Sequence, residues 1–266
     1  VVMKRRDFIA ALGGAAVMGV LLERRTIARL VRPEPETRYA SWHEANAASG
    51  SYDDALVNEF RVARALGYRS DGTLLPSNLL YLTALGLKKP DFSVVDFGGA
   101  TGELGRELQS VFPGSSFTVV ENPTLVALMR DKSPIRYVSE IPANCDIFFS
   151  SGTLQYVEKP FDYLAAGFSS AAYAVILTRN SFCNEKIYRS QTSRLFDNGA
   201  GPIPANFTDR DITYPHQTID EREVMKIAEQ KGFRLVARVD ESSGVHPYRG
   251  MVYGKELVFV RTGQVH

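Results

Sequence analysis

The chain of 266 residues has few of the residues that build metal clusters and disulfide frameworks, with only two cysteines and four histidines. Cys145 and Cys183 make neither a disulfide framework nor a cysteine metal site, and both are typical of thiols in a reducing compartment. No group of carboxylates and histidines has the spacing of metal ligands, so no metal is expected. The formal net charge of +1 gives no electrostatic reason to expect a nucleic-acid partner.

Internal repeats and low-complexity segments are also lacking. Hydrophobic residues make up 44% and charged residues 23% of the chain, which is an ordinary globular balance. This balance excludes a disordered tail protein, a collagen and a coiled coil. The length fits one large domain, or one domain with additions, and it is enough to bury a sizeable core.

The charge is unevenly spread, because residues 1–32 carry seven basic and two acidic residues while the remainder is mildly acidic. Residues 5–9 and the apolar stretch after them resemble a twin-arginine export signal. However, the apolar run of residues 9–22 is shorter than the roughly 20 residues of a spanning helix, and no Ala-x-Ala site follows it.

Basic and apolar positions alternate over residues 20–32 with roughly helical spacing, which favours an amphipathic helix on the inner face of a membrane. An exposed helix, or residues upstream of a true start at Met3, would give the same pattern. We therefore expect a cytoplasmic protein whose basic arm contacts an anionic membrane surface, with export as the alternative.

The body of the chain divides after this arm. Residues 33–90 begin with the linker prolines Pro33 and Pro35, and their helical patterns predict a lid. In residues 91–266 helical stretches, among them 103–111 and 220–231, separate short apolar strands. The predicted strands are 92–97, 116–120, 135–138, 146–149, 173–177, 234–239 and 257–261. This alternation predicts a parallel sheet, with an antiparallel final strand because no helix precedes it.

A turn of small residues follows the first of these strands and leads into a helix at about Glu103. Such a turn lets a ligand approach the backbone and the helix N-terminus. The Gly-x-Gly-x-x-Gly pattern of dinucleotide sites is not met, because Ala100 and Glu103 in one frame, or Thr101 in the other, replace its glycines.

Two carboxylates indicate a different ligand. Asp96 ends the first strand and suits a cationic amino-acid group, while Glu121 ends the next strand 25 residues later and suits both hydroxyls of a ribose. S-adenosylmethionine has these features, since it carries an ammonium, a sulfonium and a ribose but no phosphate.

The run Val94-Val-Asp-Phe-Gly-Gly-Ala-Thr-Gly resembles the first motif of class I S-adenosylmethionine-dependent methyltransferases, and residues 146–157 resemble their fourth-strand motif. More narrowly, the chain is similar to a family of uncharacterised bacterial methyltransferases often encoded near surface-polysaccharide genes. This resemblance includes residues 41–45, 119–123 and 150–160 and Arg179, and it covers about residue 39 to the end. The chain departs from the wider class at Ala100, where a glycine is usual, and at Tyr156, where histidine is common.

The resemblance implies an α/β, Rossmann-like fold with a seven-stranded, mostly parallel sheet in the order 3-2-1-4-5-7-6, helices on both faces and an N-terminal helical extension. It places S-adenosylmethionine over the carboxyl ends of strands one, two and four. The implied cofactor-binding residues are Asp96, Gly98, Gly99, Ala100, Gly102, Glu121, Ser150, Ser151 and Tyr156.

Two long connections, residues 178–218 and 240–255, are predicted on the same side as the cofactor and are expected to build the acceptor pocket. Their aromatic and hydrogen-bonding side chains suit a sugar or glycolipid, and we select Arg179, Tyr214 and Arg249 as substrate-binding residues. His216 and His246 are the candidate general bases, because histidine titrates near neutrality unaided.

These patterns predict a methyltransferase that uses S-adenosylmethionine, with O-methylation of a sugar or surface-glycan precursor as the expected reaction. A nucleic-acid base is a less suitable acceptor, because no Asn-Pro-Pro-Tyr motif follows the fourth strand. The alternative is a non-catalytic protein of the same fold that binds a partner or a membrane lipid. A dinucleotide oxidoreductase is disfavoured by the residues of the turn.

Overall fold

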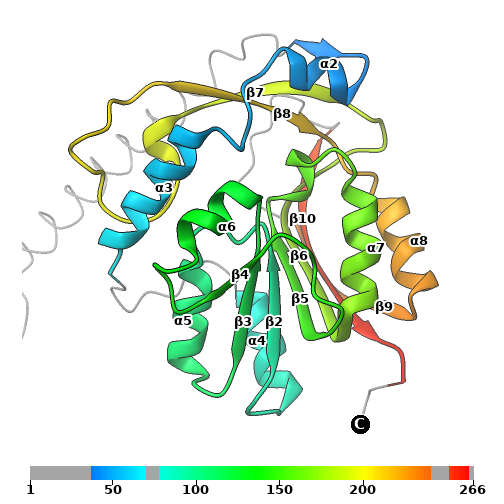
Figure 1. The fold of residues 1–266 in the computed structure, drawn as a ribbon. Coiled ribbons are helices and arrows are strands. Elements are labelled where there is room, and N and C mark those ends of the chain that lie inside the picture. Colours follow the sequence, from blue (N-terminus) through cyan, green and yellow to red (C-terminus); the bar gives the residue numbers. More distant parts are fainter. Residues whose placement is uncertain (1–36, 70–77, 241–251, 264–266) are drawn as a thin grey trace, which may run out of the picture. The chain divides into compact units, whose positions relative to one another are not determined.

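A seven-stranded sheet forms the centre of the computed structural model, which describes residues 37–69, 78–240 and 252–263 (Figure 1). In space its strands follow the order β4-β3-β2-β5-β6-β10-β9. Numbered within this sheet alone, the order reads 3-2-1-4-5-7-6, as predicted, and the labels differ only because a second sheet contributes β1, β7 and β8. The bounds are β2 (Ser93–Phe97), β3 (Ser116–Val120), β4 (Arg136–Val138), β5 (Cys145–Ser151), β6 (Ala171–Phe182), β9 (Phe233–Asp240) and β10 (Tyr253–Arg261).

The strands β4, β3, β2, β5 and β6 pair in parallel, whereas β10 runs antiparallel to both β6 and β9. The antiparallel final strand is therefore confirmed. The strand β6 continues to Phe182, five residues past its predicted end, because β10 pairs with it as far as Tyr253 opposite Phe182. The polar residues of this extension gave no apolar signal in the sequence.

Helices cover both faces of the sheet. On one face, α4 (Asn78–Leu87) and α5 (Glu103–Val111) bury Leu80 and Leu108 against Val94 and Phe117. On the other, α7 (Pro160–Ser170) and α8 (Glu221–Gln230) pack against strands β5, β6 and β10. Apolar runs that are buried on both sides, such as that of β2, reflect this double cover.

A second, smaller sheet corrects the prediction that residues 178–218 form a long loop. It contains β1 (Arg38–Tyr39), β7 (Tyr188–Arg194) and β8 (Asp211–Gln217) in the antiparallel order β1-β7-β8. A single 3-10 turn, η2 (Leu195–Asp197), lies between β7 and β8. The residues of β7, Tyr-Arg-Ser-Gln-Thr-Ser-Arg, lack an alternating apolar face, so hydrophobic periodicity could not reveal this strand.

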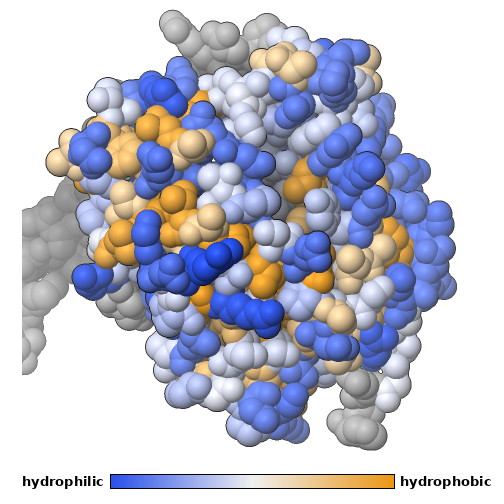
Figure 2. Space-filling view, viewed as in Figure 1, coloured by the Kyte–Doolittle hydropathy of each residue, from blue (hydrophilic) through white to orange (hydrophobic). Residues whose placement is uncertain are grey.

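Two helices near the start of the described chain lie with this sheet across the end of the central sheet (Figure 1). They are α2 (Trp42–Ala47) and α3 (Ala55–Gly67), and the side chain of Asp54 caps α3 by accepting from the Val57 amide at 3.1 Å. On α3, Val62 packs against α6 (Pro123–Met129). Figure 2 shows the apolar residues of this side in separate groups, with large ones over α3 and α6.

Arg64 of α3 holds η2 and the loop after it against α3 through hydrogen bonds. Its guanidinium donates to the carbonyl oxygens of Phe196, Asn198 and Gly201 at 2.8, 3.0 and 2.9 Å. We call α2, α3, the residues 48–54 that join them, the β1-β7-β8 sheet, η2 and the loop 198–201 the roof segment. Residues 1–32, for which an amphipathic arm is predicted, lie outside the described residues. Among those that are described, no helix is long and apolar enough to cross a membrane.

Close packing of α7 on the sheet gives a test of the fold. A methyl group added at Gly167 would lie 2.6 Å from ring atoms of the fully buried Phe148. We expect Gly167→Ala to lower the free energy of unfolding by about 1–3 kcal/mol, the usual cost of overpacking. Urea denaturation would measure it.

Gly86→Ala is the matched control, because Gly86 is also helical and its nearest atom would be 3.8 Å away. This variant should be neutral, or more stable by up to about 1 kcal/mol. Equal losses in the two variants would contradict the packing described for α7.

Candidate functional site

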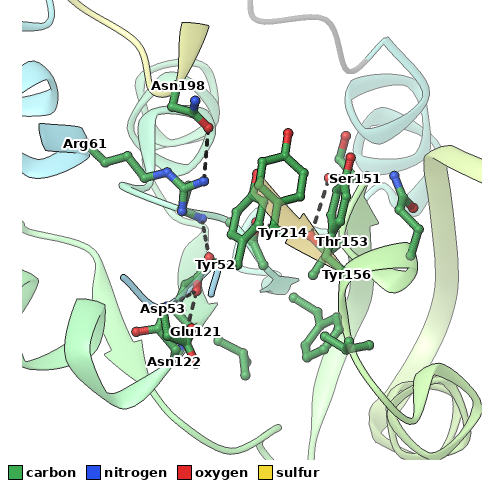
Figure 3. Close-up of a pocket in the computed structure, with 18 of the residues that line it drawn as sticks. Tyr52, Asp53, Arg61, Glu121, Asn122, Ser151, Thr153, Tyr156, Asn198 and Tyr214 are labelled. Carbon is green, nitrogen blue, oxygen red and sulfur yellow. Dashed lines mark hydrogen bonds between the residues drawn. The ribbon is translucent and has the colours of Figure 1, made fainter. Parts of the chain in front are cut away.

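A cavity of about 880 Å³ opens at the carboxyl ends of β2, β3, β5 and β6, where ligands bind in open α/β sheets (Figure 3). The roof segment forms its opposite wall. Residues from the central sheet that line it include Asp96, Gly98, Gly99, Ala100, Glu121, Asn122, Ser151, Thr153, Tyr156 and Arg179. Residues from the roof segment include Trp42, Tyr52, Asp53, Arg61, Ser193, Asp197, Asn198 and Tyr214.

The turn after β2 brings its backbone against the cavity. Gly98 has a φ of +76°, and a methyl group there would lie 2.0 Å from the Thr153 hydroxyl oxygen. A methyl group at Gly99 would lie 2.4 Å from Asp96 Oδ2. The crowding explains why this turn requires glycines, and it fixes the Asp96 carboxylate directly under the turn.

Asp96 is the least compensated charge on the cavity wall. Asp96 is only 3% exposed, and none of the described residues forms a hydrogen bond or ion pair with its carboxylate. Burial first, and then the neighbouring carboxylates of Glu121 and Glu103, raise the pKa of Asp96 to about 8. A cationic ligand group beside it would remove this cost.

Glu121 is held at the end of β3 by backbone donors. Its Oε1 accepts from the Ala100 amide at 3.1 Å, and its Oε2 accepts from the Asn122 amide at 3.0 Å. Burial raises the pKa of Glu121, while these hydrogen bonds and the nearby Arg61 guanidinium lower it. Glu121 Oε2 also accepts from the Asn122 side-chain amide at 3.2 Å, which fills both of its acceptor sites. Oε1 keeps one acceptor site, so a ligand hydroxyl could bind there. Ala100 reaches this position with a φ of +48°, a conformation that usually needs glycine.

Three tyrosines from separate elements meet on the wall near β5. The rings of Tyr52 and Tyr156 stack with centroids 5.1 Å apart, and Tyr214 contacts both edge-on at 4.7 and 5.3 Å. Tyr156 also donates to Gln191 Oε1 at 3.2 Å, and burial raises its pKa. A phenol of this kind can donate a hydrogen bond but is not a base at neutral pH.

Some predicted residues lie away from the cavity. The Ser150 hydroxyl donates to the Phe97 carbonyl at 3.1 Å inside the sheet, and Gly102 starts α5 with a φ of +73° beside Tyr137. His216 is 1% exposed behind Tyr156, and its Nδ1 accepts from Arg189 Nε at 3.0 Å. Strand register explains Ser150 and His216, because alternate side chains of a strand point to opposite faces of its sheet. Gly102 lies off the cavity because it is the N-cap residue of α5.

Two predicted residues, His246 and Arg249, lie outside the described residues. Of the others, Arg179 and Tyr214 are on the wall, and Arg179 has a φ of +55° at the end of β6. Sequence reasoning missed Asp53, Arg61 and Asn198 as wall residues. Their positions depend on how α3 and the loop after η2 fold against the sheet, for which no local motif exists. Among the described residues, no group of three or more His, Cys, Asp and Glu could hold a metal ion.

No protein-family model and no curated protein matches the sequence. Solved structures that it resembles are S-adenosylmethionine-dependent methyltransferases. One from Clostridium acetobutylicum has 11% identity and a TM-score of 0.48, covering 70% of this chain and 90% of that one. A magnesium protoporphyrin IX methyltransferase from Synechocystis with bound S-adenosylmethionine has 16% identity and a TM-score of 0.48, covering 80% and 99%. An amino pentose methyltransferase from Micromonospora echinaspora has 13% identity and a TM-score of 0.44, covering 73% and 100%. All three TM-scores are below 0.5, so these likenesses assign neither a ligand nor a reaction to this chain.

The buried Asp96 carboxylate should destabilise the ligand-free protein in a pH-dependent way. Because its pKa is near 8 in the folded protein and near 3.8 ordinarily, the folded state holds the proton more tightly, and stability falls as pH rises between these values. Asp96→Asn removes this loss. We expect the variant to be more stable than the parent at pH 9 by on the order of 1–3 kcal/mol. At pH 5 the gain in stability should be smaller, because Asp96 is then protonated in the folded parent. Denaturation at both pH values measures this, and an equal difference at both would contradict the electrostatic account.

Proposed function

We propose that this chain is a methyltransferase that uses S-adenosylmethionine as its methyl donor. The observation that carries the proposal is the Asp96 carboxylate, 3% exposed under the Gly98-Gly99 turn and without a cationic partner among the described residues. A ligand with an ammonium group satisfies it. Glu121, on the cavity wall at the end of the adjacent strand, is suited to a hydroxyl of a ribose.

The residues that would hold this cofactor fit its chemistry. Asp96 would bind the ammonium, the Gly98-Gly99 backbone would lie against the methionyl chain, and Glu121 would accept from a ribose hydroxyl. Ser151 and Tyr156, on the wall beside β5, would border the reacting end. The cofactor supplies a methyl group on sulfur, which is already a good leaving group, so the protein contributes mainly alignment and exclusion of water.

For the acceptor, we propose a hydroxyl of a sugar or surface-glycan precursor. The wall near β5 and β6 offers aromatic faces and hydrogen-bonding groups, including Tyr156, Tyr214, Ser193 and Arg179. Rings of sugars pack against aromatic side chains while their hydroxyls bind polar groups. A hydroxyl acceptor also needs a group to take its proton. Since no histidine of the described chain lines the cavity, this group would be a wall carboxylate such as Asp197 or Glu158, or the predicted His246.

Calorimetric titration with S-adenosylmethionine, S-adenosylhomocysteine and NAD tests the cofactor assignment. We expect the first two ligands to bind and NAD not to bind. Asp96→Asn should weaken S-adenosylmethionine by tenfold or more, about 1.4 kcal/mol, because the carboxylate charge that faces the ammonium is lost. Glu121→Ala should weaken S-adenosylhomocysteine by about 1.5–3 kcal/mol.

The pH dependence of the same titration separates a charge effect from a shape effect. Since the pKa of Asp96 is about 8 without ligand, a cation that binds at pH 7 must displace its proton. The parent should therefore release protons into the buffer and bind more tightly as pH rises towards 8, and Asp96→Asn should do neither. Normal binding by a folded Asp96→Asn variant would refute the assignment of this residue.

The rival function is a non-catalytic protein of the same fold that binds a partner or a lipid. Methyl transfer from labelled cofactor to candidate glycans distinguishes the two functions, since a non-catalytic protein would bind the cofactor without transferring its methyl group.

A second proposal concerns residues 1–32, whose net positive charge suits an anionic membrane surface. The full chain should sediment with anionic vesicles and be released by salt, whereas a chain starting at Glu34 should remain in solution and keep cofactor binding. Recovery of a shortened chain from the periplasm would favour export instead.

A further inference from the structure

Three charged residues from different elements meet on the β3 side of the cavity. Glu121 ends β3, Asp53 precedes α3, and Arg61 projects from α3. Figure 3 shows Asp53, Glu121 and Asn122 together, with the guanidinium of Arg61 between them and Asn198. The cofactor assignment proposed above uses Glu121 alone, and it leaves Asp53 and Arg61 without a role.

Arg61 is fixed in place by its surroundings. Its residue is 4% exposed, its Nη2 donates to Asn198 Oδ1 at 3.4 Å, and its guanidinium lies 4.3 Å from the centroid of the Tyr52 ring. It is close enough to lower the pKa of both Asp53 and Glu121 against the opposing effect of burial. A buried cation so placed permits two carboxylates to face one space without strong mutual repulsion.

Asp53 lines the same cavity as Glu121 and is close enough to raise the pKa of that group (Figure 3). Asp53 is exposed to solvent, and partial desolvation raises the pKa of its carboxyl group against the opposing effect of Arg61. Its carboxylate accepts no hydrogen bond from the described residues, so it is open to a ligand on the cavity side. By contrast, the next residue, Asp54, uses its carboxylate to cap α3 and lies 4.0 Å from the exposed Arg210. Asp54 does not line the cavity. Helix capping therefore explains Asp54 but not Asp53.

We propose that Asp53 is the second carboxylate of the ribose site, accepting from one cofactor hydroxyl opposite Glu121. The inference rests on the proposed function, since it takes the ligand at Glu121 to be a ribose. Arg61 then balances the charge of the pair. A ribose bound in this way bridges the central sheet, through Glu121, and the roof segment, through Asp53. The roof segment would then contribute a residue to the cofactor site in addition to closing the cavity.

Two ligands and one matched pair of variants test the assignment. S-adenosylhomocysteine carries both the ribose and the amino-acid end, whereas 5′-methylthioadenosine keeps the ribose and lacks the amino-acid end. We expect Asp53→Ala to weaken both ligands by at least fivefold and by similar factors, because the lost bond is to the part they share. Asp53→Asn, which keeps an acceptor oxygen, should lose less.

The matched control is Asp54→Asn, which retains a good helix cap and should change neither affinity by more than twofold. Thermal unfolding without ligand confirms that each variant is folded. Unchanged affinities in a folded Asp53→Ala variant would overturn the inference and leave the proposed function intact. A loss confined to S-adenosylhomocysteine would also overturn it, because Asp53 would then act on the amino-acid end. Failure of the parent protein to bind S-adenosylhomocysteine would instead refute the proposed function, and the inference with it.

Discussion

An uncompensated carboxylate at the end of a central parallel strand is the constraint on which the cavity depends. Asp96 is held there because β2 is paired on both sides, by β3 and β5, and because the turn after it passes directly over the side chain. Burial of a charge in this position costs stability unless a cation or a set of donors satisfies it. This cost falls at the edge of the sheet where the described cavity opens, a pattern typical of binding sites.

The roof segment determines how far the cavity is closed. Its attachment relies on two arginines one turn apart on α3. Arg64 donates to three backbone carbonyls of η2 and the loop after it. Arg61 donates to Asn198 of the same loop and also lines the cavity near Asp53 and Glu121. One arginine is thus used for structure and the other faces the cavity. The roof segment therefore places polar groups of its own on the cavity wall.

The elements that could be predicted from the sequence are those that an apolar run or a glycine turn marks locally. Strand β3 and helix α5 match their predicted bounds, because an apolar run and a glycine turn mark them directly. The strand order was implied by the family resemblance alone. The β7 and β8 strands could not be predicted, since they are polar and are held by pairing with each other and packing over the cavity. For the same reason His216 seemed available as a base, whereas the register of β8 turns it behind Tyr156.

The distribution of charge also explains why the turn after β2 does not suit a dinucleotide. A pyrophosphate needs glycines that expose amides and a neighbourhood without negative charge. Here the amide of Ala100 already donates to Glu121, and the Asp96 carboxylate lies 2.4 Å from where a Gly99 side chain would begin. A carboxylate at the end of the second strand suits either ligand, because dinucleotide sites also bind a ribose there. The difference therefore comes from Asp96 and from the missing glycines of the turn. A ligand that brings positive charge to Asp96 and a hydroxyl to Glu121 would remove the cost of burying the Asp96 carboxylate, which a pyrophosphate could not do.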